Sequence, residues 1–330
     1  DPNGNETEYD FDDLRRLVEI TAPSPFSYVT QLVWDKNGRL TQTKRQTGDV
    51  SNPWQIVSYT YNARNQVETV TDPESNVTTY DYDSVDRLWK ITNAESNVTE
   101  YLYDDANRLV TVKDPAGVSV ATYEYSDNGL VTSFTDALSN ETTYEFDGFD
   151  RGKKVILADS SHEELTYNAN SLVTNLRTRA GDNVGFAYDV LNRITERTAT
   201  GLSAVNYDYD LAGRVIEISS SPGFILSYDT AGRFISEERP DGKETVLSLD
   251  ANGNTTKITY PDSYYVDYAY DELNRLDTVK LNGNTTPDAA YSYDDLSRQT
   301  GLVLGNGAEV SYGYSDNNNL TSVNHKFASS

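Results

Sequence analysis

The stretch Tyr80-Asp81-Tyr82-Asp83-Ser84-Val85-Asp86-Arg87-Leu88 decides the fold, because its pattern returns from one end of the chain to the other. We write the pattern as Tyr-x-Tyr-Asp-x-x-x-Arg-Leu and call its second aromatic position the slot aromatic. Successive slot positions lie 19 to 27 residues apart, and nine of the fourteen spacings are 21. A period this regular predicts one structural unit stacked many times. The fifteen slot positions are Phe11, Trp34, Tyr61, Tyr82, Tyr103, Tyr125, Phe146, Tyr167, Tyr188, Tyr209, Tyr228, Leu249, Tyr270, Tyr293 and Tyr314.

Each repeat predicts a β-hairpin. Residues 77–82 and 88–92 alternate polar and apolar side chains and are rich in Thr, Tyr, Val and Ile, which is a strand signal. Turn residues separate the strands, at 83–87 inside the repeat and at 93–97 between repeats. Glycine, proline or Asn-Gly interrupts the chain about every ten residues, which argues against helices. We therefore expect an all-β fold, a single array of about fifteen hairpins that pair as one antiparallel ribbon over residues 1–330.

A ribbon of this length must curve. Fifteen hairpins supply about thirty strands, and at roughly 4.8 Å per strand a flat sheet would extend on the order of 140 Å. Strongly twisted open sheets rarely pass about ten strands without curling or splitting. We expect the ribbon to coil into a spiral, a hollow shell or a solenoid with a thin apolar layer, since only 37% of the residues are hydrophobic. The longer spacings, at 23–28, 46–54 and 282–287, predict extended loops on one rim.

The motif side chains predict structural roles. The two tyrosines of a repeat lie two residues apart, so both project from the same face of a strand. We expect them to form rows of cross-strand aromatic pairs, with a carbohydrate-stacking surface as the alternative. Aspartate follows the slot in eleven repeats and arginine comes four residues later in ten, which indicates a pair that closes the turn. In four well-preserved repeats these positions are Tyr80, Tyr82, Asp83, Arg87, Tyr101, Tyr103, Asp104, Arg108, Tyr207, Tyr209, Asp210, Arg214, Tyr268, Tyr270, Asp271 and Arg275.

Composition narrows the class of partner. The net charge of −25 predicts repulsion from phosphate backbones and anionic lipid, so we expect no nucleic-acid partner. No hydrophobic stretch is long enough to span a bilayer, and we expect no direct membrane insertion. Cysteine and methionine are both absent, which suits an exposed, oxidising location. The missing initiator methionine indicates a processed product or a piece of a longer protein, with any export signal outside this chain.

Signals for other chemistry are weak. The chain has two histidines, His162 and His325. The run Ser160-Ser161-His162-Glu163 does not predict a hydrolase, because adjacent residues on a strand point apart. The run Asp250-Ala251-Asn252-Gly253-Asn254 matches the start of a calcium loop but lacks its final glutamate, so we expect no cofactor, with weak Ca²⁺ binding in such turns as the alternative. Sequons for N-glycosylation, mostly expected from chance and duplication, begin at Asn5, Asn76, Asn97, Asn140, Asn254, Asn284 and Asn319.

The motif resembles the YD repeat, also called the RHS repeat, over essentially the whole chain. This repeat is shared by Rhs polymorphic toxins of bacteria, B/C components of insecticidal toxin complexes, wall-associated bacterial proteins and animal teneurins. The resemblance implies a long β-ribbon wound into a hollow shell, which encloses a toxin in some members and mediates cell adhesion in teneurins. Neither protease nor toxin activity carries over, because no aspartate-based self-cleavage segment follows the last full motif at Tyr312-Gly313-Tyr314.

These observations favour a non-enzymatic scaffold, extracellular or at the cell surface, that is a shell fragment or fibre-forming unit of a larger protein. The expected partners are other copies of the chain or further segments of its parent. Two alternatives stay open. The chain is part of a toxin-encapsulating cocoon, with a toxin as cargo, or it is an adhesion module that binds glycans.

Overall fold

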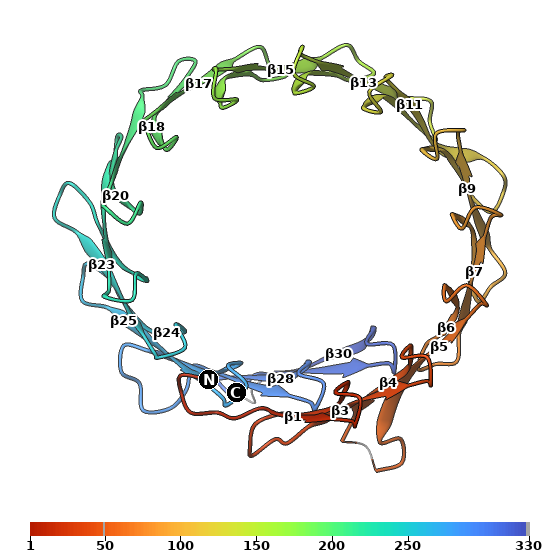
Figure 1. Cartoon of the computed structure of the whole chain (residues 1–330). Helices are drawn as coiled ribbons and strands as arrows, with labels where there is room; N and C mark the ends of the chain where they lie inside the picture. Colours follow the sequence, from red (N-terminus) through yellow and green to blue (C-terminus); the bar gives the residue numbers. More distant parts are fainter. Residues whose placement is uncertain (49, 328–330) are drawn as a thin grey trace. The chain divides into compact units, whose positions relative to one another are not determined.

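The computed structural model describes residues 1–48 and 50–327, and these hold thirty β-strands and no helix. Neighbouring strands pair antiparallel, as predicted (Figure 1). The first strand of every hairpin ends on the slot aromatic: β1 (Glu8–Phe11), β3 (Val29–Trp34), β5 (Trp54–Tyr61), β7 (Val77–Tyr82), β9 (Val98–Tyr103), β11 (Ser119–Tyr125), β13 (Glu141–Phe146), β15 (His162–Tyr167), β17 (Asn183–Tyr188), β19 (Val205–Tyr209), β21 (Phe224–Tyr228), β23 (Glu244–Leu249), β25 (Tyr265–Tyr270), β27 (Ala289–Tyr293) and β29 (Glu309–Tyr314). The second strands are β2 (Leu17–Thr21), β4 (Leu40–Gln46), β6 (Val67–Thr71), β8 (Leu88–Thr92), β10 (Leu109–Lys113), β12 (Val131–Asp136), β14 (Gly152–Ile156), β16 (Val173–Arg177), β18 (Ile194–Ala199), β20 (Val215–Ser219), β22 (Phe234–Glu238), β24 (Thr255–Thr259), β26 (Leu276–Leu281), β28 (Gln299–Leu304) and β30 (Leu320–Lys326).

The hairpins group into two compact units. Unit 1 comprises Asp1–Thr79, Tyr228–Ser236 and Glu244–Ser330, and unit 2 comprises Tyr80–Ser227 and Glu237–Lys243. Within unit 1 the first and last repeats of the chain lie against each other, with β1 and β3 beside β28 in Figure 1. Within unit 2 the antiparallel ladder runs without a break from β8 to β21. One continuous domain over residues 1–330 stays a prediction.

The turn inside each repeat, which we call the inner turn, has a recurrent backbone geometry. In the repeat of Tyr103, the Asn107 N–H donates to the Asp104 carbonyl, and the Asp104 N–H donates to the Arg108 carbonyl, both at 3.0 Å. Asn107 is left-handed, with φ of 64°, and the register shifts between Leu109 and Thr111. This is a type I turn followed by a one-residue bulge, a common three-residue hairpin connection.

The longer spacings follow β2, β4 and β26, each of which ends a repeat. All three loops therefore connect one hairpin to the next, on the same edge of the ladder. The loop after β4 includes Asp49, which is outside the described residues.

The sheet has only a thin apolar layer, as its composition predicts. Val184 and Val266 are the buried hydrophobic residues of the described chain, and none of its large side chains is fully buried. Contacts between neighbouring repeats must therefore supply much of the stability. None of the described segments is a helix of the length and apolarity that a membrane crossing requires.

Candidate functional site

The side-chain contacts that the repeats share begin with an aspartate that accepts hydrogen bonds from its own inner turn. One oxygen of Asp104, Oδ1, accepts the backbone N–H groups of Ala106 and Arg108, each at 2.9 Å, and Oδ2 accepts Arg108 Nε at 2.7 Å. The described residues contain this ion pair in ten repeats, at 2.5–2.7 Å. The pairs are Asp12–Arg16, Asp35–Arg39, Asp83–Arg87, Asp104–Arg108, Asp147–Arg151, Asp189–Arg193, Asp210–Arg214, Asp229–Arg233, Asp271–Arg275 and Asp294–Arg298.

In eight of these ten pairs the aspartate has a lowered pKa. The backbone N–H of Arg108 lowers the pKa of Asp104, and partial burial, which acts in the opposite direction, is outweighed once the Arg108 side chain is added. Arg233 lowers the pKa of Asp229 through the same backbone and side-chain bonds. A general acid or base needs a pKa moved toward the working pH. The lowered pKa values of Asp104 and Asp229 lie further from neutral pH, so these carboxylates stay ionised.

The arginine also reaches the next repeat. Arg87 Nη1 donates to the Asp104 carbonyl at 3.3 Å and to Asn107 Oδ1 at 2.8 Å. Its guanidinium lies 4.6 Å from the ring centroid of Tyr103, and the Tyr103 hydroxyl donates to the Leu88 carbonyl at 2.8 Å. We call this set the clamp: the Asp–Arg pair of one repeat, with the slot aromatic and inner turn of the next.

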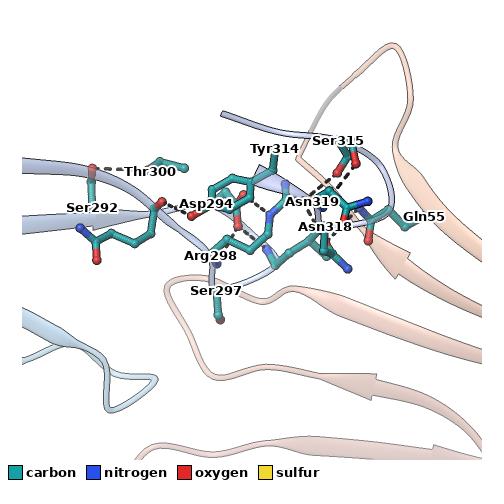
Figure 2. A network of polar contacts seen from close by, with 12 residues as sticks. Gln55, Ser292, Asp294, Ser297, Arg298, Thr300, Tyr314, Ser315, Asn318 and Asn319 are labelled. Carbon is teal, nitrogen blue, oxygen red and sulfur yellow. Dashed lines mark hydrogen bonds and ion pairs between the residues drawn. The ribbon is translucent and has the colours of Figure 1, made fainter. Parts of the chain in front are cut away.

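The clamp is repeated along the array. In the described chain the guanidinium lies 4.4–5.8 Å from the following slot ring in eight repeats, with the pairs Arg16–Trp34, Arg39–Tyr61, Arg87–Tyr103, Arg108–Tyr125, Arg151–Tyr167, Arg193–Tyr209, Arg275–Tyr293 and Arg298–Tyr314. Figure 2 shows the last of these, with Asp294, Arg298 and Tyr314. The predicted cross-strand aromatic pairs occur where Tyr123 lies 5.4 Å from Phe134 and Tyr228 lies 6.1 Å from Phe234. In the eight clamps the slot ring also has a guanidinium beside it. The carbohydrate-stacking surface stays a prediction.

Some repeats keep the clamp with different residues. The indole Nε1 of Trp34 donates to the Leu17 carbonyl at 2.8 Å, in place of a tyrosine hydroxyl. Asn62 and Gln66 replace the ion pair with a neutral hydrogen bond of 3.0 Å. Asp250 keeps the carboxylate but loses the cation, and it accepts a hydrogen bond of 2.9 Å from Asn254 Nδ2. The geometry of the turn therefore survives loss of the ion pair.

The structure brings the predicted motif residues together across repeat boundaries. Tyr80, Tyr101, Tyr207 and Tyr268, the first aromatics of their repeats, are half-buried. Slot residues Tyr209 and Tyr270 donate to the carbonyls of Ile194 and Thr255, at 2.7 and 3.0 Å, in the repeats before them. Asp210 pairs with Arg214, and Asp271 with Arg275. Sequence reasoning missed the arginine–ring contact; its signal was the spacing from the arginine to the next slot aromatic, which is 16 residues in four of the eight pairs and 17 to 22 in the others.

A second set of contacts joins the first and last repeats inside unit 1. Asn317 Nδ2 donates to Asp72 Oδ2 at 2.7 Å, and the Asn317 N–H donates to Glu74 Oε1 at 3.2 Å. The adjacent Asn318 accepts hydrogen bonds from Arg298 at 2.9 Å and from the buried Gln55 at 3.4 Å (Figure 2). We call this set the terminal contact. It is polar, and it joins residues about 250 positions apart.

The weaker chemical signals find no catalytic geometry. The Ser161 hydroxyl donates to Asp159 at 2.5 Å, while His162 begins β15 and His325 lies in β30. In the part of the chain that the structure describes, no group of three or more His, Cys, Asp or Glu residues is suited to hold a metal ion. Both carboxylate oxygens of Asp250 accept hydrogen bonds from Asn254. Weak Ca²⁺ binding there stays a prediction.

Family models match most of the chain. The model described as Teneurin YD-shell matches residues 4–149 and 85–223, and the model described as RHS Repeat matches residues 250–287. None of the curated proteins matches the chain significantly.

Solved structures share the fold at low sequence identity. The crystal structure of TcdB2-TccC3-Cdc42 has 15% identity and a TM-score of 0.60, over 99% of this chain and 22% of that one. The crystal structure of TcdB2-TccC3 without its hypervariable C-terminal region has 15% identity and a TM-score of 0.59 over the same shares of the two chains. The structure of the Photorhabdus luminescens Tc holotoxin pore has 14% identity and a TM-score of 0.53, over 97% of this chain and 21% of that one. The chain thus spans about a fifth of the length of the chains it matches.

Proposed function

Because the chain belongs to the teneurin YD-shell family, we propose that it is a non-enzymatic structural scaffold, a segment of shell wall built from YD repeats. The clamp carries this proposal. It occupies the charged and aromatic side chains of the motif, and it uses them for links to the next repeat. A repeat array of this kind gains its stability from such nearest-neighbour contacts.

The scaffold acts outside the cell or at the cell surface, joined to further segments of its parent or to other copies. Two features support this location. The absence of cysteine and methionine leaves no readily oxidised sulfur, and the net charge of −25 keeps a large surface soluble.

A toxin-enclosing shell is the second candidate. The observation that favours it is the fold shared with TcdB2-TccC3 over 99% of this chain. On this alternative, the chain supplies part of the wall, and the cargo belongs to other segments of a longer protein.

Cryo-electron microscopy of the purified chain, in the medium in which it naturally occurs, tests the scaffold. We expect a continuous β-wall, which a triple Arg87→Ala, Arg108→Ala and Arg193→Ala variant loses. A triple variant that carries Arg179→Ala, Arg197→Ala and Arg239→Ala, exposed arginines outside the ten pairs, serves as control. A wall that survives loss of the three clamp arginines would overturn the proposal. Density for a folded cargo inside particles of the parent would favour the toxin shell.

A further inference from the structure

One position of the inner turn recurs in the terminal contact. It lies three residues after the slot aromatic, and we call it the inner tip. In the last four repeats the inner tips are Asn252, Leu273, Leu296 and Asn317. Asn252 Nδ2 donates to Asp1 Oδ2 at 3.0 Å, and Asn317 binds Asp72 and Glu74. The first and last of these four tips thus bind the first repeats directly.

The two middle tips line a cavity whose lining is partly apolar and partly polar, the polar part including Arg45, Gln46 and Asp295. The cavity measures about 300 Å³, and Leu273 and Leu296 line it together with Ile20, Tyr28 and Val29 of the first repeats. Both leucines are half-buried. Asparagine tips therefore bind carboxylates, and leucine tips line a cavity together with apolar side chains of the first repeats.

The receiving surface includes the turn between repeats, which we call the outer turn. Glu74 is the third residue of the outer turn 72–76, which joins β6 to β7. Inner and outer turns lie on opposite edges of an antiparallel meander, because successive connections alternate between its edges. Inside unit 1, an inner-turn edge thus meets an outer-turn edge.

In unit 2 the same two edges carry exposed large apolar side chains among smaller and polar ones. Its inner tips Val85, Phe149 and Leu191 are 59%, 81% and 68% exposed. The other four inner tips are Ala106, Asn128, Asn170 and Ala212. On the other edge, the outer-turn residues Leu138 and Leu202 are 83% and 75% exposed.

Exposed apolar side chains that gather into a patch mark an interaction surface. Neighbouring inner turns lie about 10 Å apart, since each repeat adds two strands of roughly 4.8 Å. The exposed Val190 and Leu191 lie in the inner turn next to that of the exposed Leu211, while Phe149 lies two repeats from Leu191.

We propose that the inner-turn edge of unit 2 docks onto the outer-turn edge of unit 2 in a second copy of this chain. The partner is a second copy because this chain already joins the two kinds of edge in unit 1. Each copy carries both edges, so the contact is heterologous and adds copies head to tail. The net charge of −25 opposes close approach of two copies, so salt promotes docking. The proposal rests on the scaffold function.

Sedimentation velocity of the full 330-residue chain, over a range of protein and salt concentrations, tests the docking. We expect oligomers that lengthen with both. An inner-edge variant, Phe149→Asp with Leu191→Asp, and an outer-edge variant, Leu138→Asp with Leu202→Asp, should each weaken association about tenfold or more, because a carboxylate replaces each apolar contact. Ile225→Asp is the control: it adds a carboxylate at an exposed position within strand β21 and not in a turn.

A mixture of the inner-edge and outer-edge variants tests directly whether the contact is heterologous. Each keeps one intact edge, so a heterologous contact predicts heterodimers that do not lengthen. Three results would each overturn the docking. Ile225→Asp could weaken association as strongly as the edge variants, the mixture could contain no heterodimer, or the unchanged chain could stay monomeric in high salt. A monomer that retains its β-wall in cryo-electron microscopy would overturn the docking and leave the scaffold function intact.

Discussion

At the residue scale, each clamp arginine makes three kinds of contact at once. Arg108 binds the carboxylate of Asp104 at 2.7 Å, lies 4.7 Å from the centroid of the Tyr125 ring, and donates through Nη1 to the Ser126 carbonyl at 3.1 Å. A guanidinium can do this because it is planar and carries several N–H donors in fixed directions. A lysine ammonium keeps the charge but loses the geometry.

Arg108→Lys should therefore destabilise the chain although no charge is lost. We expect the thermal unfolding midpoint, measured by circular dichroism, to fall by about 2–4 °C. Arg179→Lys is the matched control, since Arg179 is exposed and pairs with Glu163 only at 3.7 Å. Equal midpoints for the two variants would show that the arginine geometry contributes nothing beyond its charge.

The slot hydroxyl gives a second residue-scale prediction. Tyr103→Phe removes the donor to the half-buried Leu88 carbonyl, and we expect the free energy of unfolding to fall by about 0.5–1.5 kcal/mol. Phe146 occupies the slot without a hydroxyl, so Phe146→Tyr should raise the same free energy by supplying a donor for the Val131 carbonyl. Urea denaturation measures both. Changes of the same sign would contradict the role of the hydroxyl.

The sequence predicts part of this site. The Asp–Arg pair follows from its spacing, because a carboxylate at the start of a turn and an arginine at its end are close whatever the tertiary structure. The contact between the arginine and the slot ring of the next repeat does not follow from the sequence spacing. Tyr103 and Arg87 meet only because neighbouring hairpins pair in a particular register, and tyrosine alternation gave no measure of that register.

At the element scale, the hairpins were predictable nearly to the residue. The expected strands 77–82 and 88–92 are β7 and β8. The left-handed residue four places after each slot was also visible in the sequence. It is Gly, Asn, Asp or Ser in every repeat except the first, where Arg15 has φ of 60°. Residues that tolerate positive φ mark this turn type.

Paired turn substitutions should shift stability in opposite directions. Ser96 is exposed with φ of 65° in an outer turn, so Ser96→Gly should stabilise the chain by about 0.5–1 kcal/mol by relieving left-handed strain. Gly129 has φ of 80°, and a Cβ at this position would meet no other atom within 4 Å. Gly129→Ala should therefore destabilise the chain by about 1 kcal/mol through backbone strain alone. Urea midpoints at constant slope report both. Loss of stability in both variants would show that backbone strain is not the controlling factor.

At the scale of the whole molecule, the sequence predicts the array but not the terminal contact. The motif specifies what each repeat offers its neighbour, and it does so fifteen times. The meeting of Asn317 with Asp72 instead joins residues 245 positions apart, and no position of the motif specifies it. Small differences in twist at each strand add up over such a distance, so no local pattern fixes which residues meet.

Lowering the pH should remove the stability that the clamp aspartates contribute. Backbone and side-chain hydrogen bonds lower the pKa values of Asp12, Asp104, Asp210 and Asp229. A lowered pKa in the folded state contributes stability that is present above the unfolded value, about 3.9, and is lost as pH falls through the folded value. Many clamps share this sign, so their losses coincide.

We therefore expect the urea midpoint to hold or rise slightly as the pH falls from 7 to about 5, because protonation first relieves the repulsion of a net charge of −25. It should then fall steeply below about pH 4. Repeating the series in about 1 M salt, which screens the repulsion, should remove the early rise and keep the later fall. Asp104→Asn should make that fall shallower. A midpoint that continues to rise below pH 4 would show that charge repulsion, and not the clamp, governs the stability of the array.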